Sequence, residues 1–282
     1  MQFSTSYIPT AAEVGTLSMV TYFMLAVAAY SFLGNLIFGL ATKDSVAPEH
    51  RLSRVYGAII AAVAGISYLL ITHYYHDLLH ELAHYANDPG SQAQLIRRGY
   101  NAIGQYRYID WAVTTPLLLL KMTSMLRLRF ERVPRQITGL LLADGFMVLT
   151  GYIGEQQLTP AGEIVVGAKL LWGAISTLGY LVIPFILWRF WQQHAAEVRP
   201  VERRAYRLMA LTTVTTWGVY PLGYVLSCFP GTGLNFNWLH LAFTAADIVN
   251  KVGVAALAYH AGKKLLDERL PEEAVLAGHQ SL

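Results

Sequence analysis

Charged residues are scarce in this sequence. Only 14% of its 282 residues are Asp, Glu, Lys or Arg, whereas a soluble domain usually carries about 25%. Hydrophobic residues make up 54%, and the mean hydropathy is +0.38. A chain of this composition cannot cover a water-facing surface in the usual way, and it is too apolar to be intrinsically disordered.

Cysteine is almost absent as well. Cys228 is the single cysteine, so no internal disulfide can form and a disulfide scaffold is excluded. The formal net charge of +3 is too small to suggest a nucleic-acid partner. The basic residues are better explained by their positions between long apolar stretches.

Seven stretches are long and apolar enough to cross a bilayer, which needs about 20 mostly apolar residues in a helix. They are roughly residues 17–41, 54–76, 106–126, 136–156, 164–190, 206–229 and 238–262. We therefore predict an all-α membrane protein, a seven-transmembrane-helix bundle that forms one domain over residues 1–282. Residues 266–282 are expected to be a flexible tail. These spans exclude a soluble enzyme.

Lysine and arginine placement predicts the orientation. The segments after spans one, three and five and the tail are basic, and the opposite segments are poorer in Lys and Arg. Since cytoplasmic loops carry the excess of positive residues, the N-terminus is expected outside and the C-terminus in the cytoplasm. We predict a multi-pass protein of the cell (plasma) membrane.

Several ionisable residues lie inside the predicted spans, where a charge is costly and therefore indicates a functional site by default. The informative ones are Arg107, Asp110, Lys121, Asp144, Asp247 and Lys251. At 100° per residue, Arg107, Asp110, Thr114 and Lys121 share one face of their helix. Asp247 and Lys251 are four residues apart and also share a face. The alternative is that they form structural ion pairs that hold helices together.

Lys251 has a chemistry that a structural arginine lacks. A deprotonated lysine amine condenses with an aldehyde to form a Schiff base. Once protonated, that Schiff base needs nearby carboxylates to stabilise its charge within the membrane. Asp110 and Asp247 would supply them.

At this point the sequence resembles the microbial (type 1) rhodopsins. Span three reads RYIDWAVTTPLLLLK (Arg107 to Lys121), and span seven reads ADIVNKVG (Ala246 to Gly253). Span six carries the aromatic pattern of the family, span four reads ADGFM and span five reads WGAIST. The resemblance covers all seven spans in order and is closest to proteorhodopsin- and xanthorhodopsin-like light-driven proton pumps with a lysine at the proton-donor position.

The resemblance implies all-trans retinal bound covalently to Lys251 as a protonated Schiff base. Asp110 would be the counterion and proton acceptor, Asp247 the second counterion, and Arg107 would favour ionisation of both acids. Asp144 would be a hydrogen-bonded carboxyl that lines the pocket. The other expected retinal contacts are Trp111, Leu118, Met147, Gly173, Ser176, Thr177, Trp217, Tyr220, Pro221 and Tyr224. For the aromatic residues the alternative is ordinary helix packing.

Three positions on span three sort the transport modes of the family, and here they are Asp110, Thr114 and Lys121. The first two favour outward proton transport. Lys121 departs from the commoner carboxylic acid and would return a proton to the Schiff base as a general acid. The alternative is that Lys121 extends to the cytoplasmic surface as an anchor. In that case the protein would be a photosensory rhodopsin that signals to a partner protein; a light-gated channel is a third possibility.

Span two contains a second departure from the family. An ungapped alignment puts Ser67, followed by Tyr68, where related pumps have a histidine, and a gapped alignment would choose His73. Further on, His73, His76, His80 and His84 share one helical face. This face could bind a metal or titrate with external pH, but we interpret it as an amphipathic extension that meets a long loop at 85–105, and we predict no metal site.

Gly173 replaces a tryptophan of the bacteriorhodopsin pattern, and similar pumps use this glycine as a window for a carotenoid antenna. The alternative is close helix packing through a small residue. The loop at 229–238 contains no acid, so the paired glutamates that release the proton in bacteriorhodopsin are missing. Glu155 or Glu163 could contribute, but they lie in a different loop; the alternative is that release comes late or directly through water. The partners implied by the family are membrane lipid, protons and further copies of the chain, as a trimer or pentamer; no nucleic acid is expected.

Overall fold

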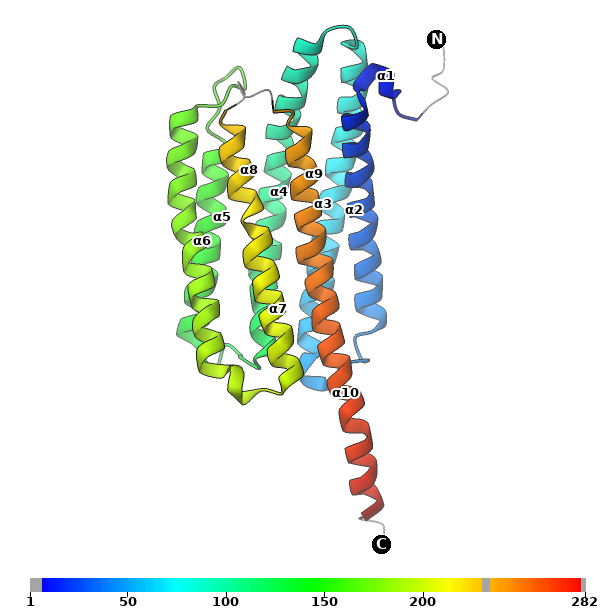
Figure 1. Ribbon diagram of the computed structural model, residues 1–282, viewed down its shortest axis with the longest axis vertical. Coiled ribbons are helices and arrows are strands. Elements are labelled where there is room, and N and C mark those ends of the chain that lie inside the picture. The colour runs from blue at the N-terminus through cyan, green and yellow to red at the C-terminus, as the bar shows by residue number, and fades with distance from the viewer. Residues whose placement is uncertain (1–6, 230–233, 280–282) are drawn as a thin grey trace.

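Long helices that run side by side make up most of the molecule (Figure 1). The structure is a computed structural model that describes residues 7–229 and 234–279, with side chains described up to residue 269. The helices are α1 (Ala11–Val14), α2 (Thr16–Ala41), α3 (Arg51–His84), α4 (Pro89–Met125), α5 (Pro134–Glu155), α6 (Val166–His194), α7 (Pro200–Trp217), α8 (Val219–Ser227), α9 (Asn237–Ile248) and α10 (Val254–His279). Helices α7 and α8 form one rod, and α9 continues into α10, so seven rods follow the short α1. The predicted seven-helix bundle is confirmed.

Five of these rods are apolar enough to cross a membrane by length and composition alone, counted over the described part of the chain. They begin at Thr16, Pro48, Pro134, Val166 and Asn237. The other two rods are α4, whose span carries buried charges, and α7–α8, which begins with a charged turn and is divided near its middle. Charged residues within α4 and in the first turn of α7 therefore set these two rods apart from the other five.

Two interruptions of regular helix lie in the last two rods. The boundary between α7 and α8 falls at Gly218, just before Pro221. A proline has no N–H to donate to the carbonyl four residues earlier and its ring clashes with that carbonyl, here the carbonyl of Trp217. Between α9 and α10 the chain forms a π-helical segment, Val249–Gly253, which contains Lys251. Such single π-helical turns are frequent at functional sites.

Helices α3 and α4 extend past the predicted spans and form a helical hairpin at the end of the bundle where α1 lies (Figure 1). The prediction of a long loop at 85–105 is wrong, because α4 begins at Pro89. Asp88 caps it by accepting hydrogen bonds from the backbone N–H groups of Gly90 and Ser91, each at 3.1 Å. Proline at the first helical position and an aspartate cap together fix this helix start.

We call the end of the bundle at α1 the outer end and the opposite end, where α7 begins, the inner end. The predicted orientation, which would make the outer end extracellular, stays a prediction. Helix α10 runs into the predicted tail, and residues 280–282 lie outside the described part. The flexibility of this tail and the oligomeric state also stay predictions.

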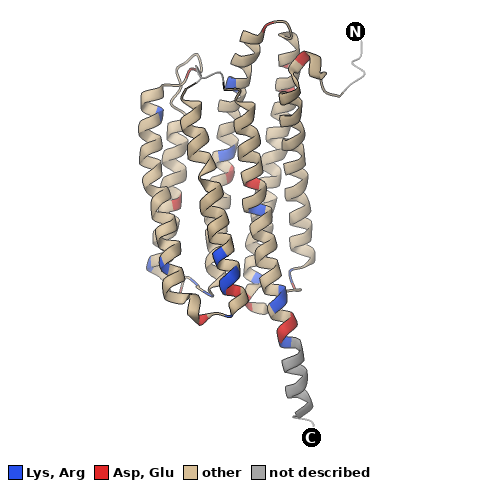
Figure 2. Cartoon of the chain, viewed as in Figure 1, with Lys and Arg blue, Asp and Glu red and all other residues tan. Residues whose placement is uncertain are grey.

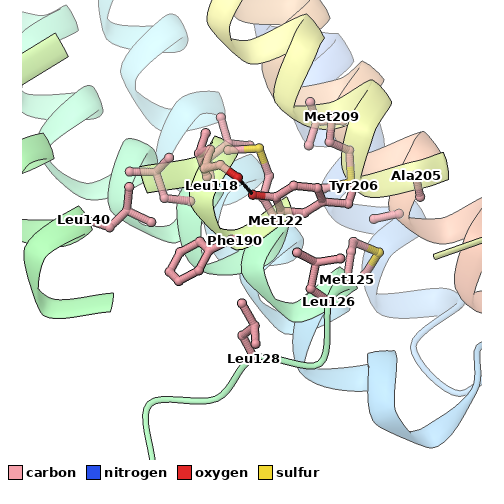
Figure 3. Packing of buried hydrophobic residues seen from close by; sticks show 14 of the residues in the cluster. Leu118, Met122, Met125, Leu126, Leu128, Leu140, Phe190, Ala205, Tyr206 and Met209 are labelled. Carbon is pink, nitrogen blue, oxygen red and sulfur yellow. Dashed lines mark hydrogen bonds between the residues drawn. The ribbon is translucent and has the colours of Figure 1, made fainter. Parts of the chain in front are cut away.

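Apolar side chains cover the surface that faces away from the bundle axis as well as the interior. Helix α6 exposes Leu171, Leu178, Leu181 and Trp188, as expected where lipid replaces water outside the bundle. Toward the inner end, α4, α5, α6, α7 and α10 share a cluster of buried apolar residues (Figure 3). In it Tyr206 donates a hydrogen bond to the carbonyl of Leu187 at 2.7 Å, which satisfies its buried hydroxyl.

A network of charged side chains ties the helices together at the inner end, where Figure 2 places charged residues of both signs. Glu202, at the start of α7 and outside the membrane span, is hydrogen-bonded to His50 at 2.8 Å and accepts from Arg127 at 2.8 and 3.1 Å. Burial alone would raise the pKa of Glu202, but these hydrogen bonds outweigh it and lower the pKa to about 2. Glu49 pairs with both Arg127 and Arg269 and extends the network to α10.

Candidate functional site

Lys251 is the centre of the site. Its side chain is buried in the middle of the last rod, and its Nζ donates a hydrogen bond to Oδ2 of Asp110 on α4. The same nitrogen lies 3.6 Å from Oδ1 of Asp247, one turn earlier. The structure therefore brings together the amine and the two carboxylates that the sequence predicted to meet.

The two carboxylates differ in their surroundings. Asp247 accepts hydrogen bonds from the hydroxyls of Tyr68 at 2.7 Å and Tyr220 at 2.6 Å, and from the indole N–H of Trp111 at 3.4 Å. In Asp110, by contrast, Oδ1 is buried without a hydrogen-bond partner among the described residues. Asp247 is thus held as a carboxylate by several donors, whereas Asp110 has a free oxygen that can accept a proton.

Arg107 connects this cluster to the outer half of the bundle. Its Nη1 lies 3.5 Å from Oδ2 of Asp247 and donates to the hydroxyl of Tyr68 at 2.8 Å, and its Nη2 donates to Thr244 at 3.2 Å. The side chain is buried. One arginine and one lysine therefore face two aspartates, which balances the formal charge of the site.

A cavity of about 360 Å³ extends from Lys251 between α4, α5, α6 and α8. All of the predicted retinal contacts line it: Trp111, Leu118, Met147, Gly173, Ser176, Thr177, Trp217, Tyr220, Pro221 and Tyr224. Small-molecule sites typically have a volume of roughly 300–1,000 Å³ and mostly apolar walls. An apolar cavity with one buried amine at its side fits a long apolar aldehyde.

Asp144 lies outside this cavity. It accepts a hydrogen bond from the hydroxyl of Thr115 at 2.9 Å and lines a separate, smaller cavity between α4 and α5. The prediction that it lines the pocket is wrong, because the hydroxyl of Thr115 stands between it and the cavity. Its predicted hydrogen bond is present. The neighbouring Thr114 donates its hydroxyl to the backbone carbonyl of Asp110 at 2.9 Å.

Lys121 lies toward the inner end of α4, and its side chain is only 1% exposed. Its Nζ points at α3, where a Cβ added at Gly57 would lie 2.7 Å from it. No acidic side chain within the described ranges forms a salt bridge with it. Lys121 therefore does not extend to the cytoplasmic surface as the alternative proposed; its side chain stays inside the bundle.

The structure distinguishes the two alignments of span two, which put either Ser67 or His73 at the histidine position of related pumps. Tyr68 is buried and its hydroxyl is hydrogen-bonded to Asp247 and Arg107, and the adjacent Ser67 is also buried. The His73 side chain is 78% exposed and lies 4.0 Å from Asp77. The ungapped alignment, with Ser67 at the histidine position, is the one that fits.

The histidine face of α3 packs against the N-terminal segment. The ring of His76 contacts that of Tyr7 in a tilted arrangement and that of His80 edge-on, with ring centroids 4.7 Å apart in both pairs. The face begins at the end of the predicted span 54–76 and continues along α3 to His84. The amphipathic extension stays a prediction.

Gly173 faces the ring of Tyr224. A Cβ added at Gly173 would lie 2.5 Å from Cε1 of that ring, so the missing side chain makes room for the tyrosine. Tyr224 is fixed there by donating its hydroxyl to the carbonyl of Lys169 at 2.7 Å. The close-packing alternative for Gly173 therefore has a specific partner.

Three further polar residues were missed by the sequence analysis or left without a role. Lys169 is fully buried within span five, and its Nζ lies 3.1 Å from Oε2 of Glu155. His240, in span seven, is also buried and lines the main cavity together with Glu155. Lys169, like Lys251, is a lysine inside an apolar stretch, and this feature could have identified it. Because Lys169 lies near the start of its stretch, the sequence did not indicate that its side chain is fully buried.

The fold and the site together define a class of protein: a seven-helix membrane bundle that holds a buried lysine between two carboxylates. The model of the bacteriorhodopsin-like protein family matches residues 18–265, and the chain belongs to this family. It is a microbial type 1 rhodopsin and a multi-pass protein of the plasma membrane.

Individual relatives agree with this assignment. Bacteriorhodopsin from Halobacterium salinarum is 31% identical over 153 residues, which cover 54% of this chain and 55% of that protein. The chain thus spans about half the length of this curated relative. The structure of Exiguobacterium sibiricum rhodopsin has a TM-score of 0.71 at 29% identity and covers 88% of this chain and 97% of its own. Xanthorhodopsin, described as a light-driven ion pump with dual chromophore, has a TM-score of 0.71 at 23% identity over 90% of this chain and 96% of its own, which indicates a shared fold.

Proposed function

We propose that this protein is a light-driven outward proton pump that carries all-trans retinal on Lys251 as a protonated Schiff base. The observation that carries the proposal is the buried amine of Lys251, which lies between Asp110 and Asp247 at the side of an apolar cavity. A cation fixed there is neutralised by two carboxylates, and it can pass a proton to either of them.

Retinal suits the cavity by shape and by chemistry. Its polyene would lie among aromatic and aliphatic side chains that include Trp111, Trp217 and Leu118, and its aldehyde carbon would bond to the nitrogen of Lys251. When bound, retinal supplies light absorption and an isomerisation that lowers the proton affinity of this nitrogen.

Asp110 is the proposed proton acceptor. It is hydrogen-bonded to Lys251, and its second oxygen has no partner among the described residues. A proton on Asp247 would instead have to displace the hydrogen bond of Tyr68 or of Tyr220. Asp247 therefore stays ionised and stabilises Arg107, while Asp110 changes its charge.

Lys121 is the proposed proton donor on the inner side. About 16 Å of helix rise separates it from Asp110, because the two positions are eleven residues apart and each residue adds 1.5 Å. Burial without an acidic partner disfavours its charged form. Lys121 would thus take up a proton from the inner surface only when water reaches it, and would then return that proton to the nitrogen of Lys251 as a general acid.

The direct test is illumination of cells that express the protein with added retinal. We expect the medium to acidify in the light, and we expect a protonophore to abolish the change. Lys251→Ala should show no light response. A photosensor would absorb light without acidifying the medium, and a channel would give currents that reverse with membrane potential; either result would refute the pump.

A carotenoid antenna near Gly173 is a separate and finer proposal. Its support is the glycine itself and the likeness to xanthorhodopsin, which is described as having a dual chromophore. The ring of Tyr224 already packs against this glycine. A carotenoid bound here would add bands to the excitation spectrum of proton transport, and Gly173→Trp should remove them.

A further inference from the structure

The outer half of the bundle holds a second buried ion pair, which the proposed function does not use. Glu155 is the last residue of α5, and Lys169 lies in the first turn of α6. Their side chains are 4% and 0% exposed, with 3.1 Å between Nζ and Oε2. A buried ion pair is weak evidence for stability, because desolvation cancels much of the attraction. Ionisable groups within a membrane span instead indicate ion or proton pathways.

Glu155, one member of the pair, lines the same cavity as Lys251. Arg107 and Asp247 line this cavity as well. Toward the outer surface, Oε1 of Glu155 lies against α4, since a Cβ added at Gly104 would be 3.3 Å from it. A continuous space therefore leads from the proposed chromophore site to a carboxylate near the outer end.

Several buried polar atoms along this space have no hydrogen-bond partner among the described residues. They are Nε of Arg107, both ring nitrogens of His240, Oε1 of Glu155 and Oδ1 of Asn101. Buried polar groups are nearly always hydrogen-bonded, to protein or to ordered water. Asn101 is one helical turn outward from Gly104, beyond the residues that line the cavity. Water molecules hydrogen-bonded to these atoms would connect the cavity to the outer end.

The groups that face the pair come from every helix packed around it. Tyr100 and Tyr108 face it from α4 and Tyr224 from α8, and Cys228 follows α8. The ammonium of Lys169 lies 4.9 Å from the ring centroid of Tyr224 and 6.0 Å from that of Tyr100. These phenols and the thiol are neutral near pH 7, so within this group Glu155 and Lys169 carry the charge. Arg107 faces Tyr100 from the side of Lys251.

We propose that the Glu155–Lys169 pair is the group that releases a proton at the outer end, an inference that rests on the proposed pump. When the proton on the nitrogen of Lys251 moves to Asp110, Arg107 loses one of its two anionic neighbours and its charge acts more strongly on the pair. An N–H bond of the Lys169 ammonium then breaks and the proton passes to water. The remaining carboxylate and neutral amine then carry one negative charge until a proton returns.

The cycle closes with one proton returned to the pair. Asp110 gives up the proton that it accepted, and this proton moves outward past Arg107 and His240 to the amine of Lys169. One proton thus leaves the outer end for each one that Asp110 accepts. Asp110 need not release its proton directly to the outside, and the loop at 229–238 needs no acid.

The test uses the retinal-loaded full chain in lipid vesicles, with a pH-sensitive dye on the outer side. In the wild type, we expect the proton to appear outside together with the absorbance change that accompanies protonation of Asp110. In Glu155→Gln and in Lys169→Met, we expect release to be delayed by at least about 100-fold, with the number of protons per cycle unchanged. The matched control is Glu163→Gln, since Glu163 is 48% exposed, lies in the same α5–α6 connection and pairs with Arg97; it should release on time.

A second measurement needs no variant to fold. In wild-type protein with ¹³C-labelled glutamate side chains, the light-induced infrared difference spectrum should show a glutamate carboxylate band that shifts at the time of release. No such shift, or unchanged release timing in both variants of a wild type that pumps, would overturn this inference alone. Absence of acidification by the wild type would overturn the proposed pump and this inference with it.

Discussion

The proposed proton-transfer residues in the outer and inner halves of the bundle, on either side of Lys251, differ in their partners. In the outer half, Arg107 pairs with Asp247 and Tyr68, and Lys169 pairs with Glu155. In the inner half Lys121 lies on a helix whose neighbouring side chains, such as Leu118 and Met122, form an apolar cluster. Its Nζ faces the bare backbone of Gly57.

This difference indicates two ways to move a proton through a membrane. Paired charges keep their positions and pass a proton between neighbours, because each change of charge is compensated locally. A buried lysine without a carboxylate partner has no nearby anion to offset the cost of its charge. It can hold a proton only while water or a movement of the helices provides solvation. The outer half is therefore suited to continuous conduction and the inner half to a gated step.

The largest effect is expected at the point where the halves meet. Lys251→Ala removes the only amine that lies between Asp110 and Asp247, so retinal should give no shifted visible band and no light response. Absorption spectroscopy after adding retinal checks this. Lys263→Ala, at an exposed lysine, should form the pigment normally. A full visible band in Lys251→Ala would refute the site.

The inner half is tested next by Lys121→Ala. Without the proposed donor, return of the proton to Lys251 should slow by about 100-fold, while the outward transfer to Asp110 keeps its rate. Flash photolysis separates the two steps, and sustained photocurrent should fall in the same proportion. If both steps keep their wild-type rates, Lys121 is a structural lysine and the two halves do not differ in the proposed way.

A smaller effect is expected from Gly57→Ala. The added Cβ would lie 2.7 Å from Nζ of Lys121, so the lysine must move and proton return should slow by about tenfold, equivalent to about 1.4 kcal/mol. Gly34→Ala is the matched control, since a Cβ there meets nothing within 4 Å. Equal kinetics in the two variants would show that the space beside Lys121 is not important.

The inner surface network should affect stability rather than transport. The pKa of Glu202 in the folded protein is about 2, below its ordinary value of 4.5. Ionised Glu202 therefore stabilises the fold above pH 4.5, and this contribution is lost as the pH falls through about 2. Glu202→Gln should lower the free energy of unfolding by about 3 kcal/mol at pH 7, taking about 1.4 kcal/mol per pKa unit.

Chemical unfolding in detergent micelles at several pH values measures this contribution. The difference between wild type and Glu202→Gln should shrink from pH 5 toward pH 2. Glu197→Gln is the control, because Glu197 is exposed and pairs with exposed Arg132; it should change stability much less. A difference that stays constant with pH would contradict the assignment to Glu202.

Much of the fold and of the central site could be predicted from the sequence. Long apolar stretches specify helices in a membrane, because each backbone N–H must be satisfied within its own segment. A lysine and two aspartates inside such stretches could be assigned to a common site, because uncompensated charges are not tolerated there. The helix over residues 89–105 was missed, since its polar composition resembles that of a loop.

The sequence by itself determined the seven membrane spans and that Lys251 must meet acidic partners. Only the tertiary structure decided that Asp247 is surrounded by hydroxyl donors while Asp110 keeps a free oxygen, that Lys121 faces Gly57, and that Lys169 meets Glu155. The physical reason is that periodicity fixes the face of a helix on which a residue lies, but not its neighbour across the bundle. That neighbour depends on how all seven rods pack, and on the side chains, such as Tyr224 against Gly173, that set their separation.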